Sequence, residues 1–136
     1  MNSSGWVPRR TVLDEQEQQH VVEGLLAVLG ALVVEDNAAR AQAAVARWLE
    51  RAAFTVEWEV PLKRWGTDER GVLDLVAQRG QLRLVIEIDR EIPRAKALRK
   101  LRRVPSAVRV VLLRGGRWCA PPPEGIDAVV CLTVRR

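Results

Sequence analysis

Three acidic residues interrupt two aliphatic stretches of this sequence, and their types and spacing suit chemistry. Asp74 lies in the run at residues 72–76. Glu87 and Asp89 lie in the run at residues 84–89. An ionised carboxylate in such surroundings must be paired, solvated at the end of a strand, or bound to a cation. Strand alternation puts Glu87 and Asp89 on one face, and an antiparallel neighbour can place Asp74 opposite them. We predict that the three carboxylates converge around Mg²⁺ or Mn²⁺.

The rest of the composition limits what such a site can do. The 136 residues include one histidine, His20, two cysteines and no tyrosine. Histidine clusters, cysteine-based zinc cages and tyrosine-linked covalent intermediates are therefore excluded. An enzyme of this composition would work with carboxylates and a metal ion. The competing interpretation is that each acid pairs with an arginine for structural reasons.

Basic residues gather in one segment of the chain. The 22 basic and 17 acidic residues give a net charge of +5, and residues 90–103 alone hold seven basic residues and one acid, or +6. Such a segment favours a polyanionic partner, and a solvated helix face is the alternative. The candidate contacts to nucleic-acid phosphates are Arg90, Arg94, Lys96, Arg99, Lys100 and Arg103.

Helical periodicity dominates the first part of the sequence. We read residues 1–12 as a flexible tail and residues 13–136 as a single domain. Apolar residues at three- and four-residue spacing predict a helix over residues 13–34. Asp36 or Asn37 can then cap a second helix that runs to about residue 53.

The period then changes to alternation, which predicts strands. In the first strand, Val56, Trp58 and Val60 would share one face, while Glu57 and Glu59 on the other are explained by the solubility of an edge strand. The predicted elements after residue 54 are strands at residues 55–61, 72–78 and 82–89, a basic helix from Pro93 to Arg103, and strands at residues 108–113 and 126–134. The second and third strands form an antiparallel pair because their turn is short. We predict an α+β (α/β layer) fold with a mixed sheet flanked by helices and an extra N-terminal helix.

Two short segments, GVLDLV at residues 71–76 and LVIEIDR at residues 84–90, carry a family resemblance. With the order of elements around them, they resemble the PD-(D/E)XK nuclease superfamily over about residues 35–113. The resemblance implies a restriction-endonuclease-like core. It also implies that Asp74 and Glu87 are the catalytic acids, that the backbone carbonyl of Ile88 is a further metal ligand, and that metal-activated water hydrolyses phosphodiesters.

The chain departs from this family at a lysine. Asp89 stands where the family usually places the lysine that orients the water, so Asp89 would be an additional metal ligand. The missing cation would come from Arg90 or from the basic helix, where Lys96 and Lys100 share a face. Two interpretations of Lys100 stay open: a relocated catalytic lysine, or a surface lysine that contacts phosphate.

The family often adds a glutamate from the helix before the first strand. Glu35 is the favoured candidate here, and since Gln42 lies seven residues further on the same face, either side chain can look toward the sheet. The second candidate, Glu50, lies between arginines and fits a solvated face. Trp65, in the polar connection after the first strand, either stacks on a base or covers the edge of the sheet.

These observations lead to one hypothesis and one alternative. The hypothesis is a cytoplasmic, metal-dependent endonuclease that hydrolyses DNA with Mg²⁺ or Mn²⁺. The alternative is a catalytically degenerate module of the same fold that binds nucleic acid or serves in assembly. No apolar run approaches the roughly 18 residues of a membrane span. The helix predicted over residues 13–34 is also a candidate homodimer interface.

Overall fold

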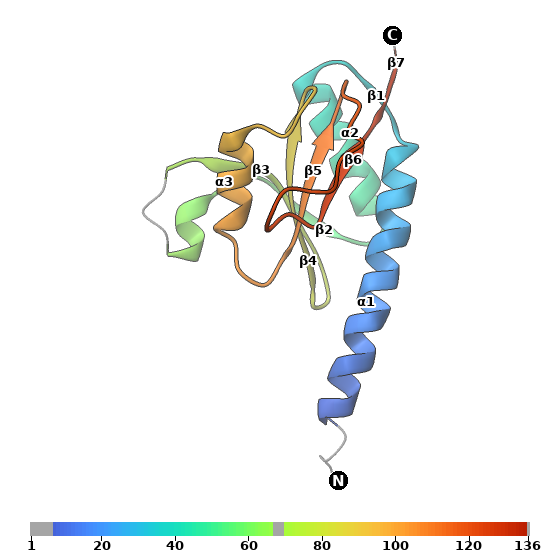
Figure 1. Cartoon of the computed structure of the whole chain (residues 1–136), viewed down its shortest axis with the longest axis vertical. Helices are drawn as coiled ribbons and strands as arrows, with labels where there is room; N and C mark the ends of the chain where they lie inside the picture. The colour runs from blue at the N-terminus through green and yellow to red at the C-terminus, as the bar shows by residue number, and fades with distance from the viewer. Residues whose placement is uncertain (1–6, 67–69, 136) are drawn as a thin grey trace.

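The computed structural model describes residues 7–66 and 70–135 of the chain (Figure 1). A five-stranded sheet forms its centre, and a separate pair of short strands joins two distant segments. In chain order the elements are α1 (Val7–Gly30), β1 (Val33–Glu35), α2 (Ala38–Arg51), β2 (Thr55–Pro61), the 3-10 helix η1 (Leu62–Trp65), β3 (Val72–Arg79), β4 (Leu82–Asp89), α3 (Ala95–Arg102), β5 (Val108–Leu113), β6 (Ala128–Cys131) and β7 (Thr133–Arg135).

The central sheet has the strand order β2-β3-β4-β5-β6 and is mixed. The first three strands form an antiparallel meander, and β4, β5 and β6 run parallel. A parallel pair needs a crossover, and α3 provides it between β4 and β5. The predicted α+β class with a mixed sheet flanked by helices is confirmed.

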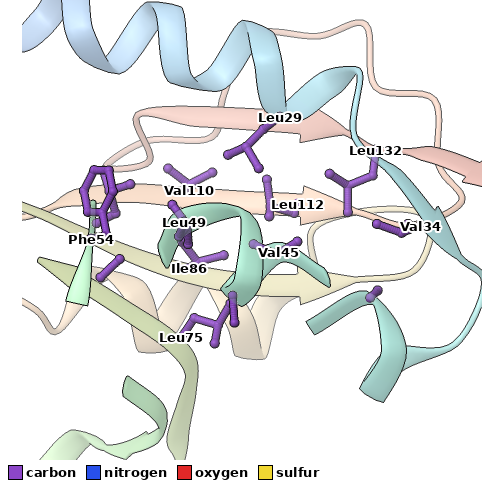
Figure 2. Packing of buried hydrophobic residues seen from close by; sticks show 14 of the residues in the cluster. Leu29, Val34, Val45, Leu49, Phe54, Leu75, Ile86, Val110, Leu112 and Leu132 are labelled. Carbon is purple, nitrogen blue, oxygen red and sulfur yellow. The ribbon is translucent and has the colours of Figure 1, made fainter. Parts of the chain in front are cut away.

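The sheet separates two hydrophobic cores. On one face, Leu29 of α1 and Leu49 of α2 pack over Leu75, Ile86 and other sheet residues in the cluster that Figure 2 shows. On the other face, Leu101 of α3 packs over a second set of residues from β3, β4 and β5. The helices therefore flank both faces of the sheet.

Several local predictions are confirmed by the structure. The strands β4 and β5 have the predicted bounds. Asn37 caps α2, and its side chain accepts a hydrogen bond from the backbone N–H of Arg40 at 2.9 Å. In β5, the four residues from Val110 to Leu113 have no exposed surface, as expected for a strand covered on both faces.

The structure corrects the predicted ends of the chain. The first helix begins at Val7, so residues 7–12 of the predicted tail are helical, while residues 1–6 lie outside the described part. That helix ends at Gly30, and residues 33–35 form β1, which pairs in parallel with β7. The strand predicted over residues 126–134 is two strands, since β6 extends the central sheet and β7 leaves it to join β1.

Alternation in β2 breaks at Glu59, which the sequence did not predict. Glu59 has a φ of 51°, a left-handed conformation that is rare outside glycine. Val56 packs on the α2 side of the sheet and Val60 packs on the α3 side, so the two valines do not share the predicted face. The neighbouring strand changes faces at the same level, between Leu75 and Leu73. This break lies beside Asp74.

No helix in the described residues is long and apolar enough to cross a membrane.

Candidate active site where two strands diverge

Asp74 and Glu87 lie where the backbone pairing of β3 and β4 ends. The register of the two strands stops at Leu75 and Ile86. Beyond this pair, the backbone N–H groups of each strand donate to a carboxylate of the other strand instead of to its backbone oxygens. The Asp74 N–H donates to Oε2 of Glu87 at 2.8 Å, and the Ile88 N–H donates to Oδ2 of Asp74 at 2.8 Å. The two carboxylates thus occupy the gap between diverging strands, and each is oriented by the backbone of the other strand.

Lys100 brings a positive charge to this pair from the opposite layer. Its ammonium group forms an ion pair with Glu87 and donates to the backbone oxygen of Val72 at 2.9 Å. The Lys100 side chain is only 13% exposed. These contacts involve two of the three N–H donors of the ammonium group.

Gly71 makes room for this lysine. A Cβ atom at Gly71 would lie 3.3 Å from Cδ of Lys100, a tight contact that would require the lysine stem to shift. Gly71 also has a φ of 125°, which side chains rarely tolerate. The glycine that opens the GVLDLV segment therefore lets the lysine stem lie against the start of β3.

Helix α2 contributes Gln42 rather than Glu35. The Gln42 amide donates to the backbone oxygen of Asp74 at 2.8 Å and to Oε1 of Glu59 at 3.4 Å. Glu35 lies in β1, where its half-exposed carboxylate pairs with Arg40 at 2.6 Å. The prediction that Glu35 faces the sheet is therefore wrong, because residue 35 precedes the helix instead of opening it. Gln42, seven residues on, is the side chain that reaches the sheet.

The electrostatics of the carboxylate pair favour protonation or a further cation. Burial, reinforced by the charge of Asp74, raises the pKa of Glu87 to about 7, although Lys100 and hydrogen bonding act in the other direction. Burial also raises the pKa of Asp74, and the nearby charge of Glu59 adds to this effect. Burial therefore outweighs the stabilisation that Lys100 and the hydrogen bonds give to the ionised carboxylates.

Asp89 does not join this pair. It lies on the same face of β4 as Glu87, as predicted, and it is 3% exposed. Its carboxylate accepts hydrogen bonds from the backbone N–H of Arg94 at 2.8 Å and from Nε of Arg94 at 3.2 Å. Across the part of the chain that the structure describes, no group of three or more acidic, histidine or cysteine side chains is placed to hold a metal. The predicted convergence of three acids is wrong for Asp89, because an unpaired N–H at the start of α3 is its nearer partner.

The basic helix is shorter than predicted, and its basic side chains lie on two sides of it. It begins at Ala95, so Pro93 precedes it, and Leu101 anchors it to the sheet. Lys100 lies on the inner side with the carboxylates. The other predicted phosphate contacts are exposed: Arg90, Arg94, Lys96, Arg99 and Arg103.

The remaining candidates lie in other surroundings. Trp65 packs against the hydrophobic core on the α3 side, and the guanidinium of Arg64 lies 5.9 Å from the centre of its ring. This favours a tryptophan that covers the sheet. Arg64 also makes two hydrogen bonds of 2.8 Å to Glu57, and Glu50 is exposed on α2.

Comparison of this chain with protein-family models, with curated proteins and with solved structures finds no match.

Proposed function

We propose that this chain is a metal-dependent nuclease with a restriction-endonuclease-like core, and that it hydrolyses phosphodiester bonds of DNA. The observation that carries the proposal is the contact of Lys100 with the Asp74–Glu87 pair. A lysine from α3 reaches the place where two strands diverge, and there it pairs with Glu87. Asp89 stands at the position where the nuclease family usually has its lysine, and its carboxylate accepts a hydrogen bond from the backbone N–H of Arg94. The positive charge that the family places on β4 is thus supplied from the neighbouring helix.

The donor set fits a hard divalent cation. Asp74 and Glu87 offer carboxylate oxygens, and because burial raises the pKa of both, a bound cation would stabilise their ionised forms. The carbonyl of Ile88 stays a predicted further ligand. When bound, Mg²⁺ or Mn²⁺ would lower the pKa of a water molecule and neutralise charge on the phosphoryl oxygens.

Each of the other contacts in the site has a separate role in the proposed reaction. Asp74 and Glu87 are held by backbone N–H groups, so their oxygens keep fixed positions during the reaction. Lys100 lies against Glu87, where its positive charge would stabilise negative charge that develops on the phosphate. Gln42 fixes the backbone of Asp74 and links it to Glu59.

The exposed basic side chains of α3 and of the loop before it suit the phosphates of the substrate. They lie on the element that carries Lys100, so a backbone bound along the helix would lie next to the carboxylates. Contacts of this kind neutralise phosphates and make affinity fall steeply with salt.

The direct test is cleavage of plasmid DNA and labelled oligonucleotides with Mg²⁺ or Mn²⁺. We expect the wild-type chain to cut and the Asp74→Asn and Glu87→Gln variants, which keep the size of each side chain, to lose at least about 100-fold in rate. The matched control is Glu50→Gln, an exposed acid on α2. Equal activity of all four proteins would contradict the proposed site. Salt-dependent binding without hydrolysis would instead favour the binding-module alternative.

A further inference from the structure

The loop between β4 and α3 presents an isoleucine to water between two arginines. Ile92 is 60% exposed, the largest value among the exposed large hydrophobic side chains of the described residues. The side chains of Arg90 and Arg94, two residues to either side, are 65% and 76% exposed. An isoleucine in this position forgoes the free energy that its burial would supply, and a partner that covered it would recover that free energy.

The loop holds this isoleucine in place instead of leaving it free to fold back. The Asp89 carboxylate accepts the Arg94 backbone N–H, which fixes the end of the loop. Pro93 is buried beside it. On the other side, Gly116 lies so close that a Cβ atom there would be 2.0 Å from the backbone oxygen of Glu91. The backbone is therefore fixed before and after Ile92.

The loop is continuous with the proposed nuclease site. It begins directly after the strand that carries Glu87 and leads into the helix that carries Lys100. Its charges match those of nucleic acid, because residues 90–103 carry a net charge of +6. A polyanion bound along α3 and the loop before it would therefore meet Ile92 as well as the arginines.

We propose that Ile92 inserts between adjacent base pairs of a double-stranded nucleic acid, while Arg90 and Arg94 contact the phosphates on either side of that step. The inference rests on the proposed function and extends it to a class of substrate. Apolar side chains such as isoleucine can insert between base steps, where they partly unstack the bases and bend the duplex. Unstacking costs least where a base is already mismatched. The preferred substrate is therefore a duplex with a weakened base step.

The test measures binding in EDTA, where metal-dependent cleavage cannot occur. The probes are two short DNA duplexes, one fully paired and one with a single mismatch, each with 2-aminopurine beside the same step. We expect the wild-type chain to bind the mismatched duplex about tenfold more tightly and to raise the 2-aminopurine fluorescence several-fold. In Ile92→Ala both the preference and the fluorescence rise should be lost. Val33→Ala, which also truncates an exposed aliphatic side chain, should behave like the wild type.

Each other result overturns the inference in a recognisable way. Salt-dependent binding with no fluorescence rise and no mismatch preference would overturn the insertion and leave the proposed nucleic-acid binding intact. An unchanged rise in Ile92→Ala would remove the role of this side chain. Failure of the wild-type chain to bind either duplex would overturn the insertion, and cleavage with Mg²⁺ or Mn²⁺ would then decide the proposed nuclease function separately. Melting temperatures equal to that of the wild type would show that both variants are folded.

Discussion

The ammonium group of Lys100 forms an ion pair with the carboxylate of Glu87, and these two side chains are 13% and 4% exposed. They come from different layers of the fold, α3 and β4. An ion pair with so little water around it orients both partners, whereas an exposed pair contributes little. The contact therefore makes the position of one helix a condition for the geometry of the carboxylates.

The first prediction concerns Lys100. We expect Lys100→Met, which keeps the length of the side chain and removes its charge, to lower the rate of DNA cleavage by at least about 100-fold. Lys63→Met, which changes an exposed lysine on η1, should cleave at the wild-type rate. Melting temperatures of both variants show whether the loss reflects unfolding. Wild-type cleavage by a folded Lys100→Met would contradict the catalytic interpretation of this lysine.

The second prediction concerns the pH dependence of stability without metal. The pKa of Glu87 is raised from 4.5 to about 7, so the folded protein binds a proton that the unfolded chain has lost. The free energy of unfolding should therefore fall as pH rises from 4.5 to 7, by up to about 3 kcal/mol from this group. Glu87→Gln should flatten that slope in chemical denaturation at a series of pH values. A wild-type stability that rises through this range would show that other groups dominate.

The third prediction separates a structural role of Asp89 from metal binding. Asp89→Ala leaves the backbone N–H of Arg94 without its acceptor and should lower the free energy of unfolding by about 1–3 kcal/mol. Asp89→Asn keeps an acceptor oxygen and should cost less. Calorimetry with Mn²⁺ should give the same affinity for Asp89→Asn as for the wild type. A tenfold weaker affinity would restore Asp89 as a ligand.

The fourth prediction concerns Gly71. Gly71→Ala places a Cβ atom 3.3 Å from Cδ of Lys100 at a backbone φ of 125°, and should lower the free energy of unfolding by about 1–3 kcal/mol. Gly24→Ala is the matched control, since nothing beyond the neighbouring backbone of α1 lies within 4 Å of its Cβ position and alanine favours a helix. Urea unfolding of both variants gives the comparison. Equal stabilities of Gly71→Ala and the wild type would show that Lys100 does not need the glycine.

The parts of the fold that the sequence predicts well have strong local signals. The aliphatic runs mark β4 and β5, and Asn37 marks the start of α2. The strands β1 and β7 have only three residues each, too few for a period, and they form through a pairing between distant segments. Nothing in the residue types around Glu59 indicates a left-handed backbone, so the change of face in β2 was not predictable.

The candidate site shows the same division. Alternation correctly placed Glu87 and Asp89 on one face, but it does not say what each carboxylate contacts. The Asp89 carboxylate accepts a hydrogen bond from the backbone N–H of Arg94, five residues away. A pattern of side-chain types does not reveal such a backbone partner. The position of Lys100 depends on where α3 packs, which helical spacing alone leaves open. Gln42 was within reach of sequence reasoning through its spacing from Glu35, yet its partner became known only from the structure.

The pairing of β1 with β7 has a consequence for biosynthesis. Val33 pairs with Thr133, and the Thr133 hydroxyl donates to the backbone oxygen of Gly30 at 3.0 Å, across 103 residues of sequence. While the chain is being made on the ribosome, the segment between α1 and α2 must wait without its partner until residues 133–135 emerge. The helices and the β2–β3–β4 meander can form earlier because their backbone hydrogen bonds join residues that are close in the sequence. The pairing of β1 with β7 can therefore form only after all five strands of the central sheet have been synthesised.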